Sequence, residues 1–149
     1  MQRIGVTTAL LASAFLVATM VAGSIPAAAD GALALGMPDN VAKEGFSYGT
    51  AVDRGTAEEA RAAALNGCRT NRDGSKTSQE LCAVYDAFRD KCVSVAMDPK
   101  AGTPGVGWAI GPDSATSDLW ALTICRATAG TGRGEYCKVT TTNCESSAK

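Results

Sequence analysis

Histidine is absent from this chain of 149 residues, and aromatic residues make up only 5% of it. The first absence removes the commonest general base, the usual zinc ligands and every catalytic triad that contains an imidazole. The second leaves little bulk for the core of a domain. No two cysteines have the Cys-x-x-Cys spacing that is typical of metal and redox sites. We therefore expect neither a metal nor a cofactor.

An excess of charge of one sign is also missing. Of the 14 basic side chains, Arg3 belongs to the leader described below, which leaves 13 against 15 acidic ones and a formal charge of −2. A protein that coats nucleic acid or an anionic membrane surface carries a basic excess. We therefore expect that the protein binds neither nucleic acid nor an anionic membrane surface, and we expect no membrane span once the leader is cleaved.

Long apolar runs are confined to the start of the chain. A short segment with one positive charge precedes an uncharged apolar run over residues 4–23. The small residues Ala27-Ala28-Ala29 then form a cleavage site for signal peptidase, before Asp30. Residues 1–29 are interpreted as a secretory signal peptide, with a transmembrane anchor of about 20 residues as the alternative. The mature protein is expected to be secreted, or retained in the cell envelope.

All six cysteines lie after this leader. An even number of cysteines in a short exported chain predicts a disulfide framework, because the space outside the cytosol is oxidising. The cysteines that we expect to be disulfide-bonded are Cys68, Cys82, Cys92, Cys125, Cys137 and Cys144.

The mature chain alternates between apolar stretches and polar connections. Residues 30–45 mix glycine, alanine and proline without a period and are expected to form a flexible N-terminal arm. A capping box formed by Thr56 and Glu59 begins a helix whose alanines fall on one face. Asp113 or Ser114 begins a second helix. Strands are predicted over 46–52, 81–88, 91–98, 105–111 and 136–144, a polar loop over 69–80, and a frayed tail over 145–149.

One sequence phrase occurs twice: Ala64-Leu65-x-x-Cys68 ends the first helix, and Ala121-Leu122-x-x-Cys125 ends the second. Strands surround both helices in the same order, so the domain over residues 46–144 divides into two related halves, 46–98 and 105–144. Duplicated units complete each other's core. We therefore predict an α+β domain in which strand–helix–strand units share one mostly antiparallel sheet, with two helices on it and disulfides as staples.

The number of cysteines in each half limits how they can pair. Each half contains three, so complete oxidation within one chain requires at least one bridge between the halves. Fifteen pairings of six cysteines are possible. If cysteines at corresponding places in the two halves form corresponding bridges, Cys68 pairs with Cys82 and Cys125 with Cys137. The third cysteine of each half is then left, and Cys92 pairs with Cys144.

Short motifs follow one another along the mature chain: Tyr48-Gly49, Ala64–Cys68, Cys82-Ala83-Val84, Cys92, Gly107-Trp108, Ala121–Cys125 and Cys137-Lys138-Val139. This series resembles the family described as domain of unknown function 4189, over about residues 45–144. Its members are exported, cysteine-rich bacterial proteins, among them secreted proteins of mycobacteria. The resemblance implies export and a small disulfide-bonded fold, and it brings no known reaction and no catalytic residues.

Carboxylate pairs are the remaining candidates for catalysis, as in glycoside hydrolases. Glu58 and Glu59 are neighbours on the first helix, so they point about 100° apart and suit the first turn of a helix better than one substrate. The other pairs are Asp86 with Asp90 and Asp53 with Asp113, for which turns and helix caps offer a structural explanation.

Candidate contact residues for a partner lie in two places. Trp120 falls at the border of the buried helix face and is our first choice, because tryptophan is enriched in binding hot spots. Arg69, Arg72 and Lys76 place three positive charges in one loop, where they would meet an acidic partner; a solvated loop is the simpler interpretation.

Two further features are interpreted structurally. Tyr48 and Trp108 occupy matching places in the two halves and are expected to anchor the core, with a sugar or peptide platform as the alternative. The glycine-rich stretch over 130–135 lacks the Gly-Lys-Ser/Thr ending of a phosphate loop and precedes a strand, so it is expected to be a connector.

These observations favour an exported protein without catalytic activity that binds a macromolecule, in first place a protein, as a secreted effector in host interaction. One alternative is an inhibitor or immunity protein against a toxin or lytic enzyme outside the cytosol. Another is a hydrolase based on Asp or Glu. The sequence leaves the oligomeric state open.

Overall fold

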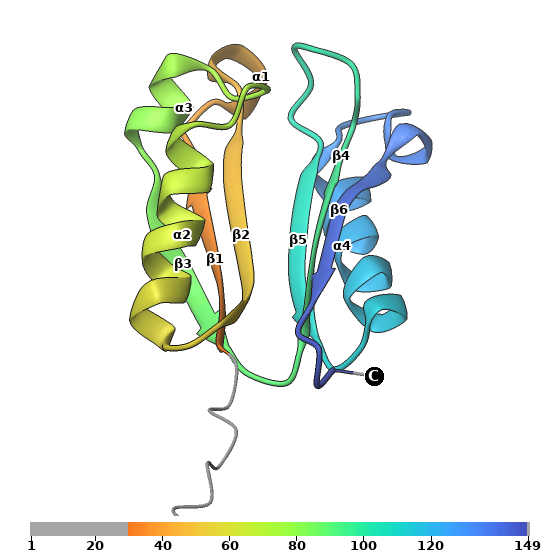
Figure 1. Ribbon diagram of the computed structural model, residues 1–149. Coiled ribbons are helices and arrows are strands. Elements are labelled where there is room, and N and C mark those ends of the chain that lie inside the picture. Colours follow the sequence, from red (N-terminus) through yellow and green to blue (C-terminus); the bar gives the residue numbers. More distant parts are fainter. Residues whose placement is uncertain (1–29, 149) are drawn as a thin grey trace, which may run out of the picture.

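Two three-stranded antiparallel sheets lie face to face, and a long helix covers the outer face of each, which gives four layers (Figure 1). The computed structural model describes residues 30–148, and the predicted signal peptide over 1–29 lies outside the described residues. The strands are β1 (Asp30–Gly36), β2 (Ser47–Arg54), β3 (Ala83–Phe88), β4 (Cys92–Met97), β5 (Val106–Gly111) and β6 (Lys138–Cys144). The helices are α1 (Val41–Glu44), α2 (Ala57–Arg69), α3 (Lys76–Glu80) and α4 (Ser114–Thr128), with a 3-10 turn η1 (Gly134–Tyr136).

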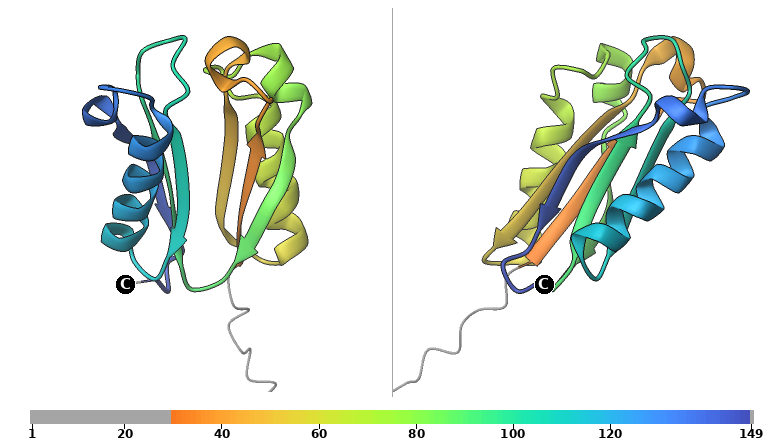
Figure 2. Two further views of the ribbon diagram at one scale, coloured as in Figure 1. Left: turned by 180° about the vertical axis from the view of Figure 1, so that it is seen from behind. Right: turned by 90° about the vertical axis from the view of Figure 1, so that its right-hand side faces the viewer.

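The two halves of the fold have the same order of elements. The first runs β1-β2-α2-β3 and forms sheet A, with strand order β2-β1-β3; the second runs β4-β5-α4-β6 and forms sheet B, with strand order β5-β4-β6. The predicted α+β class and the antiparallel pairing are confirmed. The prediction of one shared sheet is wrong, because each half builds its own sheet and the chain crosses between them at residues 89–91 (Figure 2).

β1 is the central strand of sheet A, and all seven of its residues are buried. The prediction of a flexible arm over residues 30–45 is therefore wrong: a strand begins this segment, and α1 lies near its end. With β1 included, the halves span residues 30–88 and 92–144 instead of 46–98 and 105–144.

Large and small side chains occupy opposite faces of the central strands. In β1, Leu33 and Leu35 belong to the layer between the sheets, whereas Ala32 and Ala34 pack on the α2 side. The two outer layers are therefore built from small residues, and the bulk of the core lies between the sheets. The other buried members of this central layer are Phe46, Phe88, Val93, Val95 and Val106.

The helices approach their sheets closely because the facing residues are small. A Cβ atom at Gly49 in β2 would lie 2.1 Å from the carbonyl oxygen of Ala64, and one at Gly107 in β5 would lie 2.2 Å from that of Ala121. Only glycine permits this contact between strand and helix backbones. The helix residues buried beside these contacts are Ala60, Ala64 and Cys68 in α2, and Ser117, Ala121 and Cys125 in α4.

The helix starts predicted from the sequence are confirmed. The hydroxyl of Thr56 accepts a hydrogen bond from the N–H of Glu59 at 3.1 Å, and the carboxylate of Asp113 accepts one from the first turn of α4 at 2.7 Å. The prediction of a polar loop over 69–80 is wrong in its last part, where Ser75 caps the short helix α3.

The predicted frayed tail over 145–149 is also wrong for the residues that the structure describes. The N–H of Glu145 donates to the carbonyl of Lys91 at 3.1 Å, and the N–H of Ser146 donates to the Asp53 carboxylate at 2.7 Å. The tail thus lies against the linker between the halves, at the end of the molecule where the described chain begins (Figure 1).

Three disulfides join all six cysteines, in the pairs that the sequence favoured: Cys68–Cys82, Cys92–Cys144 and Cys125–Cys137. The first and third fasten the ends of α2 and α4 to the residues that lead into β3 and β6. The second joins register partners on the neighbouring strands β4 and β6. Every bridge lies within one half once the halves are redrawn, so the expectation of a disulfide between them is wrong.

The halves are held together by side chains. The apolar layer between the sheets is the main contact. Beside it, the hydroxyls of Tyr48 and Thr141 lie 2.8 Å apart, and the amide of Asn143 donates to the hydroxyl of Thr50 at 2.7 Å. These bonds connect β2 of sheet A with β6 of sheet B along one side of the sandwich.

Disulfides persist in oxidising surroundings, so three of them favour a location outside a reducing cytosol. Between residues 30 and 148, no helix combines the length and the apolar character needed to cross a membrane. Secretion by means of a cleaved signal peptide stays a prediction.

The variant Gly49→Ala tests the close contact between helix and sheet. The added methyl group overlaps the backbone of α2, so we expect the free energy of unfolding to fall by about 1–3 kcal/mol, the usual cost of overpacking. Denaturant unfolding of the oxidised protein measures this loss.

Gly67→Ala in α2 is the matched control. Its methyl would lie 3.4 Å from the Cα atom of Gly49, an ordinary contact, and alanine favours a helix by about 1 kcal/mol over glycine. We expect this variant to be as stable as the parent or more so. If both substitutions changed the free energy of unfolding by the same amount, the close contact between β2 and α2 at Gly49 would be contradicted.

Candidate functional site

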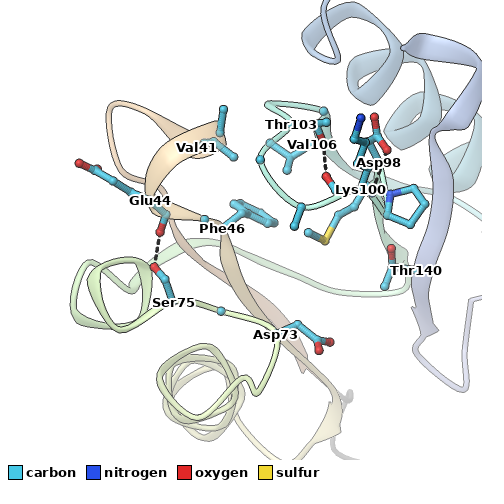
Figure 3. Close-up of a pocket in the computed structure, with 18 of the residues that line it drawn as sticks. Val41, Glu44, Phe46, Asp73, Ser75, Asp98, Lys100, Thr103, Val106 and Thr140 are labelled. Carbon is cyan, nitrogen blue, oxygen red and sulfur yellow. Dashed lines mark hydrogen bonds between the residues drawn. The ribbon is translucent and has the colours of Figure 1, made fainter.

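Loops from both halves converge at the end of the sandwich opposite the linker and line a cavity of about 600 Å³ that is open to solvent (Figure 3). Residues 41–46 contribute α1 and the two residues that precede β2, and residues 73–75 contribute the connection between α2 and α3. The connection between β4 and β5 contributes residues 97–103, 105 and 106. Lys138 and Thr140 of β6 complete the lining. The cavity is thus a joint product of the two halves.

The apolar part of the cavity continues the layer between the sheets. Phe46 and Val106 are buried members of that layer, and Val41 and Met97 pack against them. Their side chains reach the cavity because the loops, and not the sheets, cover this end of the layer. An apolar side chain of a ligand that entered here would therefore meet apolar walls.

The charged side chains at the cavity are mixed in sign. Lys43, Lys100 and Lys138 line it together with Glu44 and Asp73. The cavity also borders Asp98, whose charge is matched by an arginine outside the lining. Apart from Asp98, the side chains that line the cavity therefore carry a weakly positive net charge, which favours a ligand that carries carboxylates.

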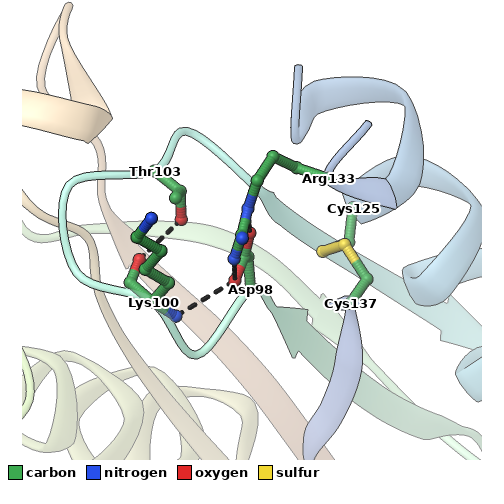
Figure 4. A network of polar contacts seen from close by, with 6 residues as sticks. All are labelled: Asp98, Lys100, Thr103, Cys125, Arg133 and Cys137. Carbon is green, nitrogen blue, oxygen red and sulfur yellow. Dashed lines mark hydrogen bonds and ion pairs between the residues drawn. A yellow bond between two sulfur atoms is a disulfide. The ribbon is translucent and has the colours of Figure 1, made fainter. Parts of the chain in front are cut away.

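The ion pair between Asp98 and Arg133 holds the loop on one side of the cavity (Figure 4). Two nitrogens of Arg133 donate to the two carboxylate oxygens at 2.7 Å and 2.6 Å, and Asp98 is only 5% exposed. The N–H of Lys100 donates to the same carboxylate at 3.0 Å, and the hydroxyl of Thr103 donates to the Lys100 carbonyl at 2.7 Å. The hydrogen bonds from Arg133 lower the pKa of Asp98, and Asp98 raises the pKa of Arg133 in return.

Arg133 is itself positioned from two sides. Its guanidinium lies 4.4 Å from the ring centroid of Tyr136, a cation–π contact. The disulfide Cys125–Cys137 joins the end of α4 to the residue that follows Tyr136, as Figure 4 shows beside the ion pair. The glycine-rich stretch over 130–135 is thus a connector whose arginine serves the fold.

The predicted contact residues do not form one surface. Arg69, Arg72 and Lys76 are exposed between α2 and α3, on the outer side of sheet A, and Lys76 pairs with Glu80 at 3.8 Å on the surface. Trp120 lies on α4, on the outer side of sheet B, and is 47% exposed. Two sheets separate the tryptophan from the basic loop.

Tyr48 and Trp108 both pack against the layer between the sheets, where each ring lies 6.0 Å from the ring of Phe46. Their interpretation as core anchors agrees with this placement. Their expected equivalence is wrong, however, because Gly49 and Gly107 take matching positions under the helices and Trp108 therefore matches Thr50.

The carboxylates proposed for hydrolysis have structural partners. Asp113 caps α4, Asp86 accepts a hydrogen bond from the next backbone N–H at 2.8 Å, and Asp90 and Asp53 accept hydrogen bonds from the tail. None of them lines the cavity. Glu58 and Glu59 lie in the first turn of α2, as expected.

The sequence reasoning missed Glu145, which it placed in a frayed tail. Glu145 is fully buried near the linker. Burial raises the pKa of its carboxyl group, and the negative charges of Asp90 and Asp30 act in the same direction. No motif marks this residue, because its burial depends on how the two halves meet.

Comparison with known proteins gives one match. The profile of a family described as a domain of unknown function, DUF4189, matches residues 31–144, which is most of the chain. No curated protein and no solved structure matches the sequence.

The variant Asp98→Asn tests the ion pair at the cavity. The pKa of Asp98 is lower in the folded than in the unfolded protein, so the pair stabilises the fold above the usual carboxyl pKa of about 3.9 and ceases to do so as the pH falls below it. We expect the variant to unfold at a lower denaturant concentration than the parent at pH 7, and the difference to shrink below about pH 4.

Asp73→Asn removes a negative charge from the rim of the same cavity and is the matched control. It should leave the midpoint of unfolding at pH 7 close to that of the parent. A difference between Asp98→Asn and the parent that stayed constant from pH 7 to pH 3 would show that the charge of Asp98 is not what stabilises the loop.

Proposed function

This chain belongs to the DUF4189 family, whose description assigns no function, so we propose its role from the site. We propose that the protein is a non-catalytic domain that binds another protein at the loop end, the end of the sandwich where the cavity lies. The observation that carries this proposal is the cavity between the halves, with its apolar walls and a rim whose charges are mixed in sign and weakly positive in balance. Its expected occupant is an apolar side chain on a segment that also carries carboxylates.

Three features of the structure support binding at this end. Loops on a structural framework commonly carry binding residues, and in this protein a disulfide fastens each long helix to the residue that leads into a strand of its sheet. An apolar pocket that takes one anchor side chain, inside a polar rim, is the usual anatomy of a protein interface. The loops come from both halves, so the binding face depends on the complete fold.

The absence of catalysis is part of this proposal. It is supported by the structural partners of the Asp residues considered for hydrolysis and by the lack of histidine in the sequence. A secreted effector that meets a host protein and an inhibitor of a toxin or lytic enzyme would both use such a binding face. The identity of the partner distinguishes these two roles.

A photo-cross-linking residue placed at Lys100 tests the proposal. The variant is expressed in the cells that naturally produce the protein, and the culture is irradiated. If those cells live in contact with a host, host cells are present during irradiation. We expect one discrete adduct with another protein, because Lys100 lies on an exposed loop at the cavity. Ala101→Trp, which fills space at the rim, should reduce the yield of that adduct.

The same cross-linker at Arg61 is the control. Arg61 is exposed on α2, outside the cavity lining, so it should give no such adduct. Identical adducts from both positions, or none from Lys100, would count against a binding face at the loop end. Identification of the adduct by mass spectrometry then separates a host protein from a lytic enzyme.

A further inference from the structure

β5 differs from the other three edge strands of the two sheets. The pairings of β2, β3 and β6 with their central strands each contain a bulge, whereas β5 pairs with β4 in unbroken register from Val106 to Gly111. β2, β3 and β6 also carry charged residues, and β5, with the sequence Val-Gly-Trp-Ala-Ile-Gly, carries none. Bulges and charges are the usual protection of an edge against pairing with another strand. β5 has neither.

Part of the outer edge of β5 is free to form hydrogen bonds. The carbonyl of Gly105 accepts from Asp98 on the β4 side, so by alternation the backbone groups of Val106, Trp108 and Ile110 point away from β4. The hydroxyl of Thr128 accepts a hydrogen bond from the Val106 N–H at 3.0 Å, so the backbone of Val106 already has a partner on this side. The outward groups of Trp108 and Ile110 have no hydrogen-bond partner among residues 30–148.

Apolar side chains flank this free edge. Trp120 and Ile124 lie one helical turn apart on α4 and form, with β5, a groove of about 410 Å³. They are 47% and 40% exposed, and no charged residue lines the groove. On the other face of the strand, Tyr85 of β3 contacts Trp108 edge to face, with ring centroids 5.6 Å apart, and is itself exposed. The apolar surface therefore continues across both sheets.

We propose that β5 pairs antiparallel with β5 of a second copy of this chain, about a two-fold axis at Ala109. Trp108 then lies opposite Ile110 of the second copy, and each such pair exchanges both of its hydrogen bonds. The two copies of sheet B become one sheet of six strands. This inference does not depend on the proposed function, because the loop-end cavity involves neither Trp120 nor Ile124.

A second copy fits this edge for three reasons. The two free residues are placed symmetrically about Ala109, so an identical edge satisfies both at once. Ala109 has a small side chain at the point where strands in a non-hydrogen-bonded pair approach most closely, about 4.5 Å between Cα atoms. Neither β5 nor the lining of the groove carries a charge that would repel its own copy across the axis.

The helices also suit this arrangement. α4 packs most extensively on β5 and next on β4, so its axis runs over these two strands and not beyond the free edge. Neighbouring strands are about 4.8 Å apart and packed helices about 8–10 Å apart, so a helix axis over β5 and β4 leaves room for both copies of α4, in contact, on one face of the joined sheet. Trp120 and Ile124 then fill the space between the two helices.

The oligomeric state of the oxidised mature protein tests the proposal. We expect sedimentation equilibrium to give twice the chain mass. The substitution Ile124→Lys places a charge in the groove at an exposed position and should raise the dissociation constant of the dimer by about thirtyfold. Leu119→Lys, on the same helix but outside the groove and 57% exposed, is the matched control and should leave the dimer intact.

Hydrogen exchange separates strand pairing from other modes of association. In the dimer, the amides of Trp108 and Ile110 should be protected, and in Ile124→Lys at the same concentration they should exchange rapidly while the amides of β4 stay protected. A parent protein that is monomeric at its highest soluble concentration would overturn the proposal. So would a dimer in which these two amides exchange freely, or one that Leu119→Lys disrupts as strongly as Ile124→Lys.

Discussion

The close contact between each helix and the strand beneath it decides where the bulky side chains of this protein can lie. Gly49 and Gly107 provide no side chain at the points of closest approach, and the two helix–sheet layers are filled by alanine, serine and cysteine. Large apolar residues are therefore gathered in the single layer between the sheets. Alanine buries little area, so the disulfides at the ends of both helices add stability that these thin layers lack.

Both proposed binding surfaces are extensions of this central layer. At the loop end, Phe46 and Val106 belong to the layer and also line the cavity. At the side, Trp108 packs against the layer and also lines the groove beside β5. The edges and loops of the two sheets leave parts of this layer uncovered, and apolar side chains meet solvent there. The fold thus exposes apolar side chains at the rims of its own core.

The sequence predicted the repeated helices, their caps and the cysteine pairs, because these depend on local spacing. It missed β1, although Gly-Ala-Leu-Ala-Leu-Gly alternates small and large residues, because its glycine and alanine content resembles that of an arm. Without β1, the halves predicted from the sequence are shifted by one strand along the chain, and Cys92 falls in the first half, whereas the structure places it in the second. The cavity was beyond sequence reasoning, since residues 41–46, 73–75 and 97–106 meet only when the sheets stack.

The central claim is that each helix is fastened to its own sheet and that the halves meet without a covalent bridge. Arginine or lysine separates each cysteine from the next along the chain, so trypsin isolates the cysteines from one another. Mass mapping of tryptic peptides from the unreduced mature protein therefore reads the pairing directly. We expect three linked pairs, each within residues 30–88 or within 92–144. A peptide pair that joins Cys68 or Cys82 to any cysteine of the second half would contradict the account.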